Sequence, residues 1–191
     1  MRMPRDLDAA ANAIEAFLRA LDLPIDGDPE LEGTGMRVAK AFAEELLEGY
    51  ASDPAEILRS ETSAETRDPV ILGPIEATLI CPHHLLPAQG KITIGYLPGD
   101  RVAGLGALAK LAHARSRRLI LQEALGEALA GDLIEHLGAR AAACFIDLEH
   151  ACVVSRSSRA HGARARTFTY RGERDEDFRA AFFAAIGQHE P

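Results

Sequence analysis

The chain has few cysteines, no long apolar run and no excess of positive charge, and each shortage excludes a class of protein. Its three cysteines are an odd number in a chain without an export signal, so metal binding or burial is a better interpretation than a disulfide framework. No stretch approaches the roughly 20 apolar residues of a membrane span. Residues 1–6 run straight into a charged amphipathic segment without the apolar core of a secretion signal, which favours a cytoplasmic protein.

Charge is unevenly distributed along the chain. The formal net charge of −8 argues against a general nucleic-acid binder, because such proteins carry a basic surface. Residues 150–172 nevertheless contain no acidic residue but five arginines, which are Arg156, Arg159, Arg164, Arg166 and Arg171. One interpretation is a local anion site, since guanidinium groups suit phosphate. The other is a solvated strand face or a subunit contact whose arginines pair with acidic neighbours.

Residue periodicity predicts helices and strands in separate blocks. With 191 residues, 47% of them hydrophobic, the chain is long enough for one well-cored domain with a small helical appendage. Apolar residues at helical spacing predict helices over residues 6–23, 34–50 and 175–186, and two more within residues 104–137. Residues rich in Val, Ile and Thr predict strands over residues 70–72, 75–81, 91–97, 140–148, 151–155 and 164–170. This order predicts an α+β fold, with helices packed on one face of an antiparallel sheet.

The most informative motif is the tetrad Cys81-Pro82-His83-His84, which is followed much later by His150-Ala151-Cys152. Cys81 and His84 are three residues apart, so one turn of chain can direct both at a single ion, and Cys152 can complete a Cys2His set. Such a set suits a catalytic zinc, and three protein ligands leave one coordination position for water. Zinc lowers the pKa of that water to about 7, which makes it a hydrolytic nucleophile at neutral pH.

Further motifs accompany the tetrad in order and with nearly constant spacing, and together they resemble the GTP cyclohydrolase I family. They are Leu85-Leu86-Pro87, Gly90-Lys91, Gly95-Tyr96-Leu97-Pro98, Gly104-Leu105, Gln122-Glu123 and His150-Ala151-Cys152. The resemblance implies a tunnelling fold, with residues 1–68 as an N-terminal helical segment and linker and residues 69–191 as the catalytic domain. It also implies that subunits join their sheets into a barrel and form a homodecamer, with active sites at subunit contacts.

The activity implied by the resemblance is conversion of GTP to 7,8-dihydroneopterin triphosphate and formate, with water adding at C8 of the guanine. Zinc would be held by Cys81, His84 and Cys152. His150 would move a proton at a purine nitrogen, and His83 would assist in acid-base work. Histidine suits both tasks because its pKa lies near the operating pH.

The resemblance also implies the residues that bind GTP. The family's guanine-reading pair matches Gln122 and Glu123, and its triphosphate-binding cations match Arg37, Lys40, Lys110 and Arg156. Without the resemblance, Arg37 and Lys40 would be interpreted as a solvated helix face, since they are simply two cations three residues apart.

The chain departs from the family pattern at three places. Pro82 stands where the family has a glutamate, Gly106-Ala107 stands where it has Ser-Lys, and the segment after Arg156 lacks the usual glycine. Two hypotheses follow. The first is a zinc-dependent GTP cyclohydrolase I with a remodelled phosphate pocket. The second is a diverged tunnelling-fold paralogue that acts on, or only binds, a different purine or pterin.

Overall fold

The structure is a computed structural model that describes residues 5–59, 61–63, 67–156 and 160–187. The chain divides into two compact units, residues 1–48 and residues 49–191, here called the N-terminal and C-terminal units. Among the described residues, no helix has the length and apolarity required to cross a membrane. The predicted boundary between helical segment and catalytic domain at residue 68 stays a prediction.

The N-terminal unit is a pair of crossing helices. It contains α1 (Leu7–Ala20), α2 (Thr34–Lys40) and a π-helical turn at Ala41–Leu46. Asp6 begins α1 by accepting a hydrogen bond from the backbone N–H of Ala9 at 2.9 Å. The helices touch where Gly35 meets Ala11, because a Cβ added at Gly35 would lie 2.5 Å from the Ala11 carbonyl oxygen. Only glycine permits this close crossing.

The second predicted helix, residues 34–50, is interrupted in the structure. After α2 the chain passes through the π-helical turn and then a 3-10 turn at Glu48–Ala51. The backbone N–H of Gly49 donates to the carbonyl oxygen of Arg117 at 3.1 Å. Long-range backbone pairing therefore takes this donor out of the helix that periodicity alone predicts.

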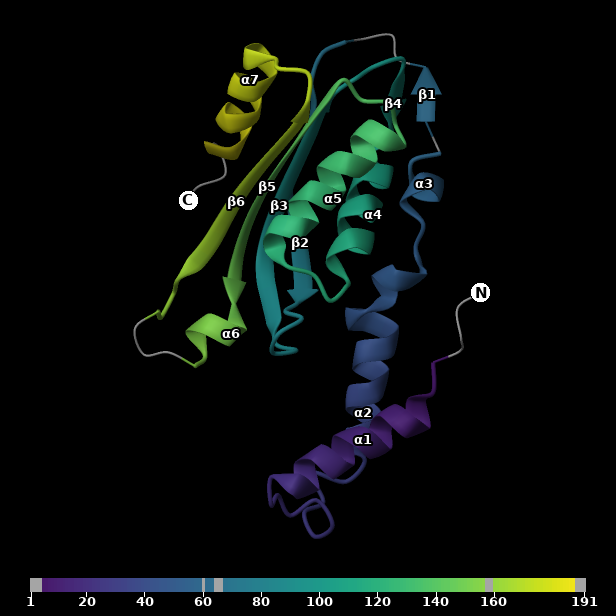
Figure 1. Ribbon diagram of the computed structural model, residues 1–191, viewed down its shortest axis with the longest axis vertical. Coiled ribbons are helices and arrows are strands. Elements are labelled where there is room, and N and C mark those ends of the chain that lie inside the picture. Colours follow the sequence, from purple (N-terminus) through teal and green to yellow (C-terminus); the bar gives the residue numbers. More distant parts are fainter. Residues whose placement is uncertain (1–4, 60, 64–66, 157–159, 188–191) are drawn as a thin grey trace. The chain divides into compact units, whose positions relative to one another are not determined.

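The C-terminal unit is built on a four-stranded antiparallel sheet in the order β2-β3-β5-β6 (Figure 1). Its strands are β2 (Val70–Ile80), β3 (Pro87–Leu97), β5 (Ala141–His150) and β6 (Arg164–Gly172). A short second sheet pairs β1 (Glu61–Ser63) with β4 (Arg101–Ala103). The helices are α3 (Pro54–Ile57), α4 (Leu105–Ser116), α5 (Gln122–Glu135), α6 (Ala151–Val154) and α7 (Glu176–Gly187).

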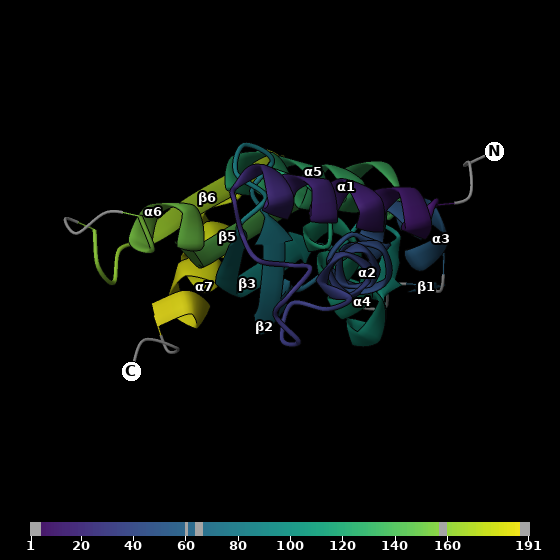
Figure 2. The same cartoon turned by 90° about the horizontal axis from the view of Figure 1, so that it is seen from below.

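Helices cover the two faces of this sheet unequally. Ile92 and Ile146, paired across β3 and β5, are fully buried on the face against which Leu111 of α4 and Leu125 of α5 pack. Figure 2 shows α5 on one side of the strands and α7 on the other. The predicted α+β fold, with helices on one face of an antiparallel sheet, is confirmed, and α7 adds partial cover to the second face.

Helix α7 covers the second face of the sheet by packing on side chains that alternate between the two faces along β5. Ala141 and Ala143 of β5 face away from α4 and α5, and they form a second buried cluster with Phe178 and Phe182 of α7. Burying an aromatic side chain of this size contributes about 1.5–3 kcal/mol relative to leaving it exposed. The C-terminal helix predicted at residues 175–186 is thus held by two phenylalanines one turn apart.

The predicted strand at residues 151–155 is wrong, because these residues form the short helix α6. Val153 and Val154 have high strand propensity. However, β3 begins at Pro87, and the last pair that it makes with β5 joins Ala88 to His150. Beyond His150 the chain has no strand on that side to pair with, so it turns out of the sheet.

Candidate metal-binding active site

The tetrad forms a closed loop between β2 and β3. The backbone N–H of Cys81 donates to the carbonyl oxygen of Leu86, and that of Leu85 donates to the carbonyl oxygen of Cys81, both at 2.9 Å. Leu85 adopts a left-handed backbone with φ 54°, which is uncommon outside glycine and is found at sites that the fold constrains. Pro82 lacks an N–H, but neither closing bond uses a donor at that position. This departure from the family pattern therefore leaves the loop intact.

The loop brings Cys81 and His84 together, and α6 adds Cys152. The Sγ of Cys81 lies 3.7 Å from Nδ1 of His84. Zinc bonds of about 2.3 Å to sulfur and about 2.0 Å to nitrogen at a tetrahedral angle would place two such ligands roughly 3.5 Å apart. The three ligand atoms of Cys81, His84 and Cys152 all lie within 4.8 Å of one another. The donor set fits a single zinc ion.

Electrostatics at the two thiols also favours a cation. Burial is the main cause that raises the pKa of Cys152, and its contact with Cys81 raises the pKa further. The Cys152 thiolate is therefore disfavoured without a metal, whereas a divalent ion held beside it would stabilise the charge. The sequence placed these residues 71 positions apart, and the pairing of Ala88 with His150 is what brings their segments together.

His150 and Gln122 form the next part of the site. His150 ends β5, and its Nε2 lies 2.8 Å from Oε1 of Gln122, the first residue of α5. Burial lowers the pKa of His150, and the charge of Glu123 opposes that shift. The neutral imidazole is thereby favoured, which is the form that can accept a proton.

The two remaining predicted polar residues of this region are open to solvent. Glu123 lies exposed in the first turn of α5, next to Gln122. His83 is exposed, and its ring centre lies 6.3 Å from that of His84. Both side chains are therefore accessible to a ligand near the Cys2His group, and their predicted roles stay predictions.

The four predicted phosphate-binding cations are distributed over both units. Arg37 and Lys40 lie exposed on α2, and Arg37 donates to the carbonyl oxygens of Glu32 (2.7 Å) and Glu30 (3.1 Å). Lys110 is exposed on α4 and lines two cavities together with Ser52 and Ile57, while Arg156 is exposed just after α6. Arg156 is four residues from Cys152, and its charge lowers the pKa of that thiol against the stronger raising effects. Shared binding of one triphosphate by these four residues stays a prediction.

Other arginines of the basic segment are engaged with acidic residues. Arg164 and Arg166 of β6 both form ion pairs with Asp147 of β5, and Arg171 lies 3.8 Å from Glu127. For these three, the interpretation as a strand face paired with acidic neighbours is favoured. Arg159 lies outside the described residues. Asp147 gave no local signal of this pairing, because it precedes its partners by 17 and 19 residues.

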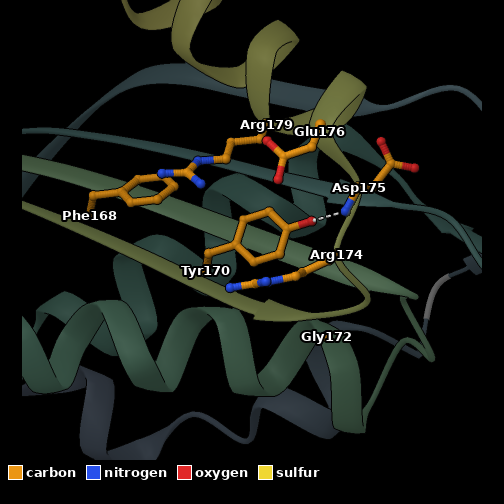
Figure 3. A pocket seen from close by; sticks show the side chains of 7 residues that line it. All are labelled: Phe168, Tyr170, Gly172, Arg174, Asp175, Glu176 and Arg179. Carbon is orange, nitrogen blue, oxygen red and sulfur yellow. Dashed lines mark hydrogen bonds between the residues drawn. The ribbon is translucent and has the colours of Figure 1, made fainter.

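A separate cavity of about 350 Å³ lies between β6 and the start of α7 and contains none of the predicted site residues (Figure 3). The Tyr170 hydroxyl on its wall donates to the Glu173 carbonyl oxygen at 2.7 Å and accepts from the backbone N–H of Asp175 at 3.2 Å. The Asp175 carboxylate accepts from the Phe178 N–H at 2.8 Å. These polar groups serve to begin α7, which gives the cavity a structural explanation.

Fold and site together define an α+β protein with a Cys2His group suited to a catalytic metal at one end of its sheet. Family comparison gives the particular identity. The model of the family "GTP cyclohydrolase I" matches residues 10–187, so the chain belongs to the GTP cyclohydrolase I family. Its tunnelling fold, predicted from the sequence motifs, is confirmed with that membership.

Individual relatives agree with the family model. GTP cyclohydrolase 1 of Chromobacterium violaceum is 38% identical over 187 residues, covering 95% of this chain and 90% of the relative. GTP cyclohydrolase 1 of Dehalococcoides mccartyi is 36% identical over 183 residues, covering 92% and 96%. Among solved structures, the archaeosine synthase QueF-Like in the apo form has a TM-score of 0.46 and 14% identity over 58% of this chain and 100% of that chain, which is too remote to support an argument.

Proposed function

We propose that this protein is a zinc-dependent GTP cyclohydrolase I that converts GTP to 7,8-dihydroneopterin triphosphate and formate. The observation that carries the proposal is the Cys2His group of Cys81, His84 and Cys152, whose ligand atoms lie within 4.8 Å of one another. When bound there, zinc would activate a water molecule for addition at C8 of guanine. We further propose that the protein acts in the cytoplasm as a homo-oligomer, with a decamer as the predicted form.

The residues beside the metal group supply proton transfer. His150 is half-buried and its pKa is lowered by burial, so it is suited to take a proton and return it to a purine nitrogen during ring opening. His83 is exposed in the loop between β2 and β3 and is proposed to assist. His83 precedes the ligand His84 in sequence, and His150 lies two residues before Cys152, so these two imidazoles are proposed to serve the two hydrolytic steps that opening the ring and releasing formate require.

Guanine and triphosphate are bound by separate groups in this proposal. Of the pair Gln122 and Glu123, Glu123 offers an exposed carboxylate that can accept hydrogen bonds from the N–H edge of guanine. The buried Gln122 amide would have to leave its present partners to make such a contact. Arg37, Lys40, Lys110 and Arg156 are proposed to bind the phosphates.

One observation supports a second hypothesis. Gly106 and Ala107, at the start of α4, supply neither the hydroxyl nor the amine that the family pattern places there, and Ala107 is buried. A protein that lacks these phosphate contacts is suited to a ligand with fewer phosphates. The second hypothesis is therefore a paralogue that acts on, or binds, another purine or pterin.

Incubation of zinc-loaded protein with GTP, followed by measurement of formate and of the pterin chromophore, decides between them. The first hypothesis predicts formate and pterin in equal amounts from GTP. Guanosine and GMP, tested in parallel, should be converted poorly because they lack the triphosphate. Conversion of either one without conversion of GTP would establish the second hypothesis instead.

A further inference from the structure

The Gln122 side chain lies inside the protein, although it belongs to the active site. The residue is 2% exposed. Its Nε2 lies 3.0 Å from the Ile146 carbonyl oxygen, 2.9 Å from that of Ala165 and 3.1 Å from Oγ1 of Thr167. Its Oε1 lies 2.8 Å from Nε2 of His150. Every polar atom of this amide therefore has a partner within the chain.

The chemistry of these partners fixes the orientation of the amide. The carbonyl oxygens of Ile146 and Ala165 can only accept hydrogen bonds, so the atom that faces them must be the amide nitrogen. A flipped amide would place its own oxygen against two other acceptors with no proton between them. The Gln122 oxygen must then face His150.

That orientation determines where His150 carries its proton. An amide oxygen has no proton to donate, so the Nε2 of His150 must be the donor of the 2.8 Å hydrogen bond. In a neutral imidazole the other nitrogen, Nδ1, is then unprotonated. Within the described part of the chain, Nδ1 of His150 has no hydrogen-bond partner. It is the ring nitrogen left to exchange a proton with a ligand.

We propose that Gln122 is a positioning residue that holds His150 in the Nε2–H tautomer, so that Nδ1 is the atom that exchanges a proton with the substrate. The proposal rests on the proposed function, in which His150 is the proton carrier. It gives Gln122 a task other than reading guanine through its side chain, and it leaves guanine recognition to Glu123.

The packing of α5 explains how a helix residue reaches this position. Gly126 lies one turn after Gln122, and a Cβ added there would lie 2.6 Å from Oγ1 of Thr169 on β6. The glycine lets the first turns of α5 lie close against β5 and β6, within reach of the carbonyl groups that hold the amide. The tautomer of His150 is thus set by strand backbone through the amide of a helix residue.

The first test is independent of turnover. Solid-state 15N NMR of the full-length, zinc-loaded protein with 15N-labelled histidine reports which ring nitrogen is protonated, and the His150 signals are assigned from their loss in a His150→Asn variant. We expect His150 to be neutral with a protonated Nε2 and an unprotonated Nδ1. A protonated Nδ1 with an unprotonated Nε2 would overturn the proposal, whether or not GTP proves to be the substrate.

The second test separates positioning from guanine binding. Gln122→Met keeps the length of the side chain but removes the amide, so we expect kcat to fall about 10- to 100-fold with KM for GTP changed less than about twofold. In the same variant the His150 signals should show both tautomers in exchange. A raised KM with unchanged kcat would show that Gln122 contacts guanine and would overturn the proposal.

Thr169→Val is the matched control for packing. It alters the same contact between α5 and β6 without touching the Gln122 amide, so kcat and the His150 tautomer should stay as in the parent protein. An equal loss of kcat in this variant would show that the effect of Gln122→Met is structural. If the parent protein releases no formate from GTP, the proposed function fails, while the NMR result still decides the tautomer.

Discussion

Cys144 and Cys152 differ by eight positions but have different surroundings. Cys144 belongs to β5 and is buried in the main core, where burial strongly raises the pKa of its thiol. Such a thiol stays protonated and behaves as a small apolar side chain. Cys152 is half-buried beside Cys81 and His84. Only the second environment suits a metal ligand.

We expect Cys152→Ala to lose zinc and GTP turnover together, because two protein ligands rarely hold a catalytic ion. Metal content per chain, measured after purification, checks the ligand assignment directly. Cys144→Ala is the control, and it should lose some stability but keep its zinc. Unchanged zinc in Cys152→Ala would refute the ligand set.

Arg156 and Arg164 provide a second contrast between residues of one type. Arg164 is engaged by Asp147, whereas Arg156 is exposed next to α6. Since a hydrogen bond to a charged group contributes about 1.5–3 kcal/mol, Arg156→Ala should weaken GTP binding about 10- to 150-fold with zinc retained. Arg164→Ala should bind GTP as the parent does. Equal GTP affinity of Arg156→Ala and the parent in a binding titration would remove Arg156 from the pocket.

The residues of the site differ in how far the sequence alone could predict them. Cys81 and His84 are three positions apart in one motif, so their convergence follows from a single turn of chain. The family resemblance assigned Gln122 to guanine. Its hydrogen-bond partners lie 24, 43 and 45 residues away, and no local pattern reports them. A prediction from sequence recovers residue type and motif, but the partner of a buried amide depends on tertiary packing.

At the scale of elements, a buried ion pair joins α4 to α5. Arg115 forms two hydrogen bonds with Asp132, whose side chain is 4% exposed, and this contact is the main cause that raises the pKa of Arg115. The two helices carry Lys110 and Gln122. Their relative placement therefore depends in part on this pair.

Asp132→Asn should destabilise the protein by about 3 kcal/mol, because it leaves the Arg115 guanidinium partly buried without its counter-charge. Denaturant unfolding checks the value. Glu127→Gln is the control, since the pair that Glu127 forms with Arg171 is solvent-exposed and should contribute less than about 1 kcal/mol. Similar stability losses in both variants would contradict the structural role assigned to the buried pair.

Most segments with a clear helix or strand pattern were predicted well, but residues 151–155 were not. The helices within residues 104–137 and at 175–186 appear as α4, α5 and α7. Residues 151–155 have the composition of a strand but form α6, because β3 begins at Pro87 and offers no partner beyond Ala88. Propensity is local, whereas strand formation needs a neighbour whose position the local sequence does not report.

At the scale of the whole molecule, both outer strands of the four-stranded sheet are long. They are β2, with 11 residues, and β6, with nine. A long edge strand presents backbone N–H and C=O groups that can pair with a strand of another chain. The row Glu76, Lys91, Asp147 and Arg166 crosses the sheet in register with alternating charges, so the two edges carry opposite signs. A second copy could continue the row.

Assembly of the full-length protein is therefore expected, and light scattering coupled to size-exclusion chromatography measures it. We expect a mass that is a multiple of the single chain, with ten copies as the predicted form. The mass should fall in high salt to the extent that charges at the sheet edges contribute. A single-chain mass at all salt concentrations, in protein that converts GTP, would contradict active sites formed at subunit contacts.

The most direct test of the central claim is a zinc titration of the metal-free protein in the presence of GTP, with pterin formation followed by absorbance and bound zinc measured on the same samples. We expect the rate to rise in proportion to bound zinc and to level off at one zinc per chain. Full activity without zinc would contradict the account, as would one bound zinc per chain without conversion of GTP.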